Sequence, residues 1–161
     1  MNIFVLDPDP IRSAEMLCDK HVVKMILESN QMLSTVAHKN GHDAPYRPTH
    51  ARHPCTLWAG ESRQNWDWLV RHSRGLCEEY TRRYGRVHKS QAVTVWAEDL
   101  DIDLPDLGQT PFRLAMPDVY KCADPITSYR KYYRSEKSRF ARWKLGNAPK
   151  WWKVGDVNDR W

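Results

Sequence analysis

Apolar residues recur at helical spacing in three long stretches of the chain, separated by segments rich in proline, glycine and aspartate. The first stretch predicts a helix over residues 11–38 that ends at an Asn-Gly pair, and the second predicts a helix over 55–84 that ends at a glycine. The third begins at an Asp-Pro pair and predicts a helix over 124–144. A shorter helix is expected over 90–98.

The segments between these helices carry no apolar period. The N-terminal NIFVLD is too short for a helix and ends at DPDP, so we expect an extended arm there. Residues 42–54 form a proline-rich loop, 99–112 an acidic irregular segment, and 150–161 an aromatic and basic tail. We therefore predict an all-α fold, a compact single domain over residues 1–161 with three main helices, an extended N-terminal arm and an irregular aromatic C-terminal tail.

Length and charge narrow the class of protein. A chain of 161 residues is the size of one domain, and 25 Lys and Arg residues against 20 Asp and Glu residues give a net charge of +5. This bias favours an anionic partner, of which nucleic acid is the commonest. The sequence shows neither a signal-peptide pattern nor an apolar run of membrane-spanning length. We expect a monomer without a membrane partner in the cytoplasm, that of the host cell if a phage encodes it, with reduced cysteines mostly in the core.

Histidine and cysteine gather in the stretch HARHPC, where His50, His53 and Cys55 are candidate metal ligands. Two histidines three residues apart in a loop with one cysteine match no common structural zinc signature, so we expect no metal. The alternative for His50 and His53 is packing or contact with phosphate. The sequence has no GxSxG nucleophile elbow and no phosphate-binding glycine loop, and no cofactor is expected.

The stretch CDKHVVKMILE, residues 18–28, places charged side chains close to the apolar face of the first helix. At 3.6 residues per turn, His21, Lys24 and Glu28 fall on one stripe, which Met25 shares. A half-buried glutamate must pair with a cation or take up a proton. Spacing alone favours a structural ion-pair network over an active site here.

Three stretches, taken in order, resemble the phage pyrimidine-dimer DNA glycosylases, the family of endonuclease V of T-even phages. In the first, a short apolar arm leads into a long helix with Asp19, His21 and, seven residues after the histidine, Glu28. The second is the helix that ends at Gly85, which is similar in position and length to the family's middle helix. The third matches the family's pattern of Pro and Tyr before a helix, then Arg, Glu-Lys and Pro-x-Trp, in Pro117, Tyr120, Arg134, Glu136-Lys137 and Pro149-Lys150-Trp151. The family's fold is a compact, mainly helical single domain.

The resemblance implies a DNA glycosylase and abasic-site lyase that acts on damaged or unusual bases in duplex DNA. In the family, the N-terminal α-amine attacks C1′ of the damaged nucleotide, the base leaves, a Schiff base forms with the opened sugar, and β-elimination cuts the strand. Carried over to this chain, Glu28 is the acid-base residue and His21 is its neighbour on the stripe. The nucleophile is the amine of Met1 or, with unusual processing, that of Asn2, whose bulk hinders removal of the initiator methionine. Lys24 offers a further amine on the stripe, which we rank behind the N-terminus because pairing with the glutamate would keep it protonated.

The resemblance also indicates where DNA would bind. Leu27 stands where the family has an arginine before the catalytic glutamate, which removes one expected contact from this helix. Phosphate contacts and stacking surfaces are instead expected from the basic, aromatic final third and the histidine loop, in Arg130, Arg134, Lys137, Arg139, Trp151, Trp152, His50 and His53. Two alternatives remain: a phage enzyme on the same scaffold that acts on modified DNA bases or nucleotides, and a non-catalytic phage factor that binds nucleic acid or nucleotides.

Overall fold

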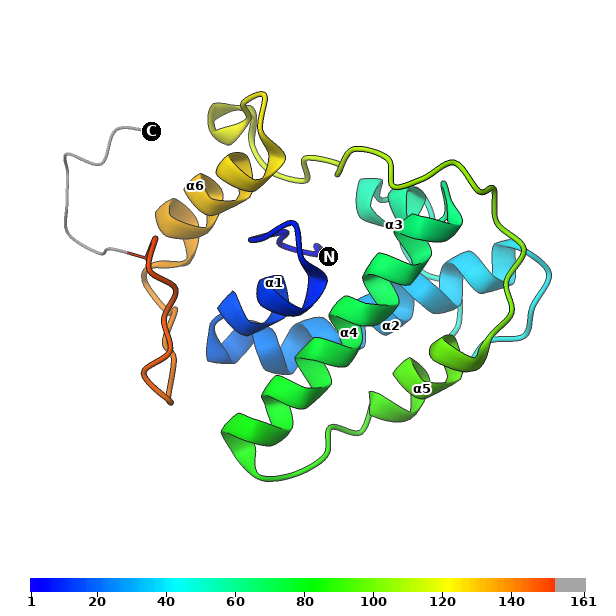
Figure 1. The fold of residues 1–161 in the computed structure, drawn as a ribbon, viewed down its shortest axis with the longest axis horizontal. Helices are drawn as coiled ribbons and strands as arrows, with labels where there is room; N and C mark the ends of the chain where they lie inside the picture. Colours follow the sequence, from blue (N-terminus) through cyan, green and yellow to red (C-terminus); the bar gives the residue numbers. More distant parts are fainter. Residues whose placement is uncertain (153–161) are drawn as a thin grey trace.

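The computed structural model describes residues 1–152, and in this range the chain is helical, without strands. In chain order the helices are α1 (Pro10–Met16), α2 (Asp19–Lys39), α3 (Pro54–Ala59), α4 (Arg63–Tyr84), α5 (Gln91–Asp99), the 3-10 helix η1 (Asp118–Tyr120) and α6 (Pro125–Lys137) (Figure 1). The predicted all-α fold is confirmed. The end of the predicted aromatic tail, residues 153–161, lies outside the described residues.

The core forms where α4 packs against α1 and α2, with α3 and α5 adding to the same body (Figure 1). Fully buried side chains from α2 and α4, including those of Ile26, Leu33 and Leu76, fill the space between the helices. Gly75 permits the close approach of α1 to α4, because a Cβ atom at this position would lie 3.0 Å from Cβ of Ala14. The packing of α4 against α1 and α2 therefore forms the centre of the fold.

The predicted helix over 11–38 is wrong in one respect, since it is two helices with a break at Leu17 and Cys18. The apolar period continues through the break because both helices bury residues against the same core. At the break, the guanidinium of Arg83 on α4 donates to the main-chain oxygens of Glu15 and Leu17, at 3.0 and 2.9 Å. These bonds satisfy carbonyls that the end of α1 leaves without intrahelical partners.

The predicted helix over 55–84 is likewise divided, into α3 and α4. Gly60 ends α3, and the side chain of Ser62 accepts a hydrogen bond from the Asn65 amide to cap the start of α4. A serine at this position is a strong N-terminal signal. At the other end of α4, Gly85 adopts a left-handed conformation with φ of 67°, as its predicted stop requires.

The last helix, α6, is shorter than predicted and ends at Lys137 instead of 143 or 144. The chain then turns back to the break between α1 and α2. There the indole Nε1 of Trp143 donates to Met16 O at 3.1 Å, and the Lys144 amide donates to Oδ2 of Asp19 at 2.9 Å. These tertiary bonds replace further turns of α6. The shorter helix α5 forms close to its predicted bounds.

The N-terminal arm is extended, as predicted, and runs through the interior. Residues 2–6 are buried, and Figure 1 shows the N-terminus in the middle of the fold, between α6 on one side and α3 and α4 on the other. The cysteines Cys18, Cys55 and Cys77 are buried free thiols, as expected of reduced core residues.

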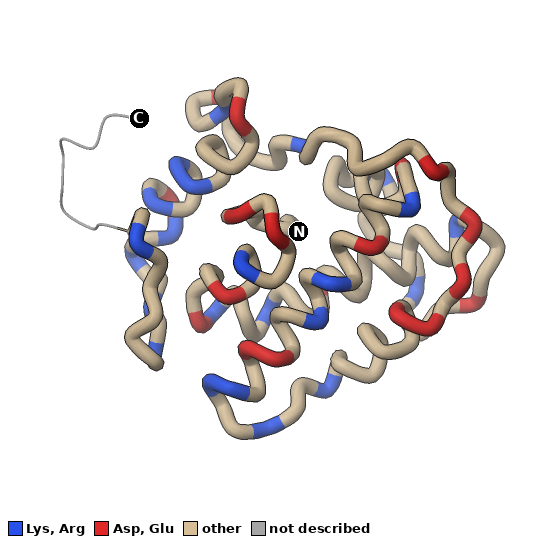
Figure 2. The backbone as a smooth tube through the Cα atoms, viewed as in Figure 1, with Lys and Arg blue, Asp and Glu red and all other residues tan. Residues whose placement is uncertain are grey.

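Charge is distributed unevenly over the fold. Figure 2 shows Lys and Arg along α6 and the segment after it, whereas Asp and Glu follow the connection that leaves α5 at the opposite edge. Among the described helices, none is both long enough and apolar enough to cross a bilayer.

Candidate active site

The site begins at the N-terminus, where the α-amine of Met1 lies 3.8 Å from Oε1 of Glu28. Both side chains are largely enclosed, with 2% of that of Met1 and 13% of that of Glu28 exposed. The second carboxylate oxygen, Oε2, is buried and has no hydrogen-bond partner among the described residues. Leaving such an acceptor unpaired costs free energy. An amine and a carboxylate oxygen that can take up a proton are thus held side by side.

Asn2 fixes the arm that carries the amine. Its Oδ1 accepts hydrogen bonds from the amides of Ile3 and Phe4, at 2.8 and 3.0 Å, and its Nδ2 donates to Ala115 O at 2.8 Å. Phe4 follows with a φ of 57°, which is rare for a bulky residue and is maintained by the surrounding contacts. The side chain of Asn2 therefore has a structural role that keeps Met1 beside Glu28.

A second amine lies near the same carboxylate. Nζ of Lys24 is 4.0 Å from Oε1 of Glu28, one helical turn away on α2. The lysine side chain is 63% exposed, whereas the side chain of Met1 is 2% exposed. Water screens the exposed pair, so Lys24 contributes little to holding Glu28 in place.

The histidine loop approaches the site through His53. Nδ1 of His53 accepts a hydrogen bond from the Cys55 amide at 3.1 Å and caps α3. Burial, the charge of the N-terminal amine and the charge of His50 lower the pKa of His53, in that order. His50 itself is exposed, has a φ of 48° and shares a hydrogen bond of 2.8 Å with the Thr49 hydroxyl.

Cys55, close to the amine, does not have the properties of a nucleophile. Burial raises the pKa of its thiol to about 11, and the opposing effects of neighbouring groups, the N-terminal amine among them, are smaller. A buried thiol with a raised pKa is inert at neutral pH. The Cys55 thiol is therefore not a candidate nucleophile.

The structure separates His21 from Glu28, although the two share a stripe of α2. Seven residues of helix place them about 10 Å apart along its axis. His21 instead stacks on Phe4 with ring centroids 4.5 Å apart, and its Nδ1 lies 2.9 Å from the hydroxyl of Tyr133. Burial, followed by the charges of Lys137 and two lysines of α2, lowers the pKa of His21 to about 3, so the ring is neutral at pH 7. This arrangement supports a packing role for His21.

The basic residues expected to bind DNA differ in exposure and in the contacts that they make within the protein. Arg130 is held inside the fold, with Nε donating to Leu6 O at 2.8 Å and Nη2 3.7 Å from Asp7. The ammonium of Lys137 lies over the ring of Phe4, 5.5 Å from its centroid. Arg134 is half-buried on α6, while Arg139 is exposed just beyond it.

The tail tryptophans pack against the domain instead of standing free. Both rings meet Tyr133 edge-on, with centroid separations of 6.4 Å for Trp151 and 5.9 Å for Trp152. Nε1 of Trp151 also points at the sulfur of Met16, at 3.4 Å. Both residues are half-buried, so one part of each ring remains open to a partner.

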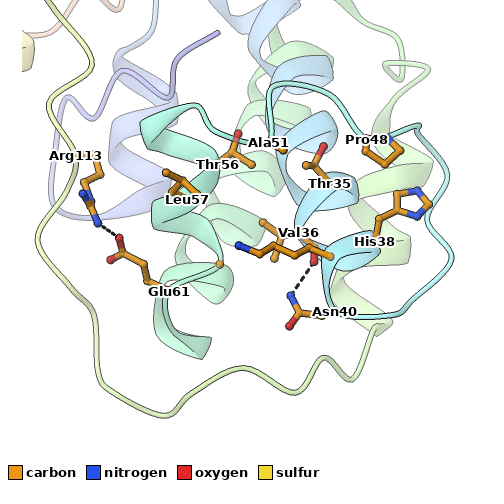
Figure 3. Close-up of a pocket in the computed structure, with 12 residues that line it drawn as sticks. Thr35, Val36, His38, Asn40, Pro48, Ala51, Thr56, Leu57, Glu61 and Arg113 are labelled. Atoms are coloured by element: carbon orange, nitrogen blue, oxygen red, sulfur yellow. Dashed lines mark hydrogen bonds and ion pairs between the residues drawn. The ribbon is translucent and has the colours of Figure 1, made fainter.

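A pocket of about 670 Å³ lies between the C-terminal half of α2 and α3 (Figure 3). Thr56 lines this pocket and also places its hydroxyl 3.8 Å from the sulfur of Met1. In Figure 3 the guanidinium of Arg113 points to the carboxylate of Glu61, with which it pairs at the edge of the pocket. This cavity could not be predicted from a local pattern of residues, because the packing of two helices creates it.

Within residues 1–152, no three side chains of His, Cys, Asp or Glu come together as a metal site would need. His50, His53 and Cys55 thus do not form a ligand set in this fold.

A family model described as pyrimidine dimer DNA glycosylase matches residues 1–92, more than half of the chain. The chain belongs to this family. The matched part of this DNA glycosylase contains the first four helices and with them Met1, Glu28 and His53, whereas α6 lies beyond it. Membership in the family makes DNA the substrate class. Comparison with curated proteins and with solved structures finds no significant match.

Proposed function

We propose that this DNA glycosylase also cleaves abasic sites, with the α-amine of Met1 as nucleophile and Glu28 as the acid-base residue. The observation that carries the proposal is the distance of 3.8 Å between the amine nitrogen and Oε1 of Glu28, whose side chain is 13% exposed. A nucleophile and a base within reach of one another are what covalent catalysis requires. The unpaired Oε2 of Glu28 supports the same assignment, because it can accept the proton that the amine must lose.

The proposed reaction proceeds through an imine on the sugar. Glu28 takes a proton from the amine, the nitrogen attacks C1′, and the bond from C1′ to the base breaks with its electron pair leaving on the base, which is protonated. Glu28 gives its proton to the departing base, takes the second proton from the nitrogen now bonded to C1′ and passes it to O4′ as the bond from C1′ to O4′ opens. An iminium between Met1 and C1′ remains. Loss of a C2′ proton to Glu28 expels the 3′ phosphate, and water releases the product from the amine. The target nucleotide must leave the base stack to expose C1′.

Borohydride trapping tests the proposal directly. The purified protein, whose intact mass first establishes that Met1 is retained, is incubated with an abasic-site duplex and borohydride. The tryptic peptide of residues 1–12 contains no lysine, so an adduct found on this peptide lies on the α-amine. We expect the adduct on this peptide. If the wild-type protein gives no adduct and no strand nick, the lyase activity is refuted.

Two variants show which of the two amines near Glu28, that of Met1 or that of Lys24, forms the Schiff base. Glu28→Gln is expected to lower the trapping rate by about 10²-fold, because it removes the proton acceptor. Lys24→Gln is the matched control, and since its pair with Glu28 is exposed we expect a change of less than about threefold. Loss of trapping in Lys24→Gln alone would assign the Schiff base to the lysine.

The pocket beside Thr56 favours a second candidate, an enzyme on this scaffold that acts on modified bases or nucleotides. A volume of about 670 Å³ is within the range of small-molecule sites. Thermal unfolding with free nucleosides and nucleotides tests it, because a ligand at 100 times its Kd stabilises the native state by about 2.7 kcal/mol. A melting temperature that free nucleotides leave unchanged, with trapping on duplex DNA retained, would exclude this candidate.

A further inference from the structure

The outward face of α2 beside the candidate site carries apolar and basic side chains. Val23 and Leu27, four residues apart, are 38% and 40% exposed. Lys20 and Lys24 are exposed on the same face, because residues three, four and seven positions apart line up on a helix. The sequence of residues 20–27 contains no acidic residue. This face therefore combines exposed aliphatic surface with positive charge.

Leu27 is the member of this face that lies closest to the reacting groups along the chain. It directly precedes Glu28, and consecutive Cα atoms lie about 3.8 Å apart. Side chains of successive residues point about 100° apart around a helix axis. Glu28 therefore faces the α-amine of Met1, while Leu27 stands beside it on the outer surface of α2.

The reacting groups border this outer face. Oε1 of Glu28 lies 4.0 Å from the ammonium of Lys24, whose side chain is 63% exposed. The side chain of Met1 is 2% exposed, but the residue as a whole is only half-buried, so its open part belongs to the main chain. A sugar that reaches the amine of Met1 is thus close to the face that carries Leu27.

The substrate of this family demands a surface of this kind. Duplex DNA hides C1′ of the target nucleotide, and turning that nucleotide out leaves a gap in the base stack. Proteins that kink or open a duplex frequently insert an apolar side chain, such as leucine, between the base steps. Lysines beside such a side chain can contact the phosphates. Leu27, Lys20 and Lys24 provide both parts on one helix face.

We infer that Leu27 is the wedge of this DNA glycosylase: its side chain enters the duplex at the target and fills the gap that the extruded nucleotide leaves. Lys20 and Lys24 contact the flanking phosphates, so duplex DNA is the partner that covers this face. Leu27 acts on the conformation of the DNA and not on proton transfer. The assignment rests on the proposed function for its effect on strand cleavage, whereas the opening of the duplex can be measured without it.

Two substitutions of Leu27 and one control test the wedge. Leu27→Ala removes it, whereas Leu27→Met keeps an apolar side chain of similar volume. Leu107→Ala is the matched control, because it shortens a leucine that is 68% exposed on the acidic connection after α5. Since each change affects an exposed side chain, we expect melting temperatures within about 2 °C of the wild type.

The first measurement follows the DNA and needs no lyase activity. An abasic-site duplex carries 2-aminopurine next to the abasic site, and the fluorescence of this base rises when it leaves the stack. We expect the same rise with saturating wild type, Leu27→Met and Leu107→Ala, and about half of it or less with Leu27→Ala. A full rise with Leu27→Ala, or no rise with the wild type, would overturn the inference.

The second measurement compares trapping rates at saturating DNA on the abasic duplex and on the same abasic strand alone. A single strand has no paired stack to open, so we expect Leu27→Ala to lose about tenfold on the duplex and less than about twofold on the single strand. Leu27→Met should restore the duplex rate. An equal effect on both substrates would contradict the wedge, because it would place the action of Leu27 on Glu28. If the wild-type protein traps no DNA while the fluorescence depends on Leu27 as expected, the proposed lyase fails and the wedge stands.

Discussion

Nη1 of Arg83 donates to Oδ1 of Asp19 at 3.0 Å and joins the last turn of α4 to the first turn of α2. The same guanidinium pairs through Nε with Oε1 of Glu79 at 2.9 Å, and neither the arginine nor this glutamate has more than 1% of its side chain exposed. Because Arg83 also bonds the end of α1, a single side chain connects three helices. Asp19, part of the motif that suggested an active site, thus belongs to the framework.

Replacing Arg83 with methionine is expected to destabilise the protein by about 3–5 kcal/mol, because the buried carboxylate of Glu79 loses the buried one of its two arginine partners. Arg82→Met is the matched control. Arg82 pairs with the other oxygen of Glu79, but its side chain is 55% exposed, so the expected cost is below about 1 kcal/mol. Urea denaturation of the two variants measures the difference, and similar midpoints would contradict the assigned role of burial.

The same arginine shows how far the fold could be predicted from the sequence. The apolar period located the helices correctly, since it reflects which residues face the core. It could not reveal the break at Leu17 and Cys18, because the period is unchanged there and the stabilising bonds come from a residue 66 positions away. By contrast, the break before α4 had a local signal in Gly60 and the capping residue Ser62.

Stability is expected to fall with acid below pH 6.5. Burial, together with the charges of nearby lysines, lowers the pKa of His21 to about 3. Burial lowers the pKa of His72 to about 4. Both folded-state pKa values lie below the unfolded value, so the unfolded chain binds more protons and the neutral rings stabilise the fold fully only above pH 6.5. Each histidine then costs about 1.4 kcal/mol per pH unit as the pH falls toward its folded pKa. Denaturant midpoints between pH 7.5 and 5 measure this slope, and a flat profile would contradict it.

Arg139 is expected to contact a DNA phosphate, since it is an exposed cation beside the basic helix α6 (Figure 2). Arg139→Gln should weaken binding to duplexes of any sequence and reduce the slope of log K against log salt by about 1. Lys89→Gln removes the same charge from the turn between α4 and α5 and serves as the control. An equal loss of affinity in both variants would show that net charge, and not a contact at α6, is responsible.

Asn2→Asp is expected to destabilise the fold by about 1–3 kcal/mol and to slow borohydride trapping. The carboxylate retains the acceptor for the amides of Ile3 and Phe4 but places an oxygen against the Ala115 carbonyl, where Nδ2 now donates at 2.8 Å. Asn40→Asp makes the same change at an exposed helix end, where Nδ2 donates to Val36 O, and should cost at most about 1 kcal/mol. Equal midpoints for the two variants in urea would count against the role of Asn2.

The candidate site could be predicted only in part, for reasons that concern distance along the chain. The resemblance indicated the N-terminal amine and Glu28, which the fold brings to 3.8 Å, and their catalytic roles stay predictions. The shared helical stripe also placed His21 in the site beside Glu28. Residues on one stripe share an angular position around the helix axis, but they can lie far apart along that axis. His53 was expected at DNA or in packing, and the structure shows instead that its Nδ1 caps α3.

The bond from Asn2 to Ala115 has a consequence for the order of events during synthesis. The first residue leaves the ribosome more than a hundred residues before the segment that secures it is made. During this interval the amine is accessible to every enzyme that trims or acetylates nascent chains, and closure of the arm ends that access. Acetylation in this window would block the amine that we propose as nucleophile, so we expect the yield of competent protein to depend on how soon the arm closes after synthesis.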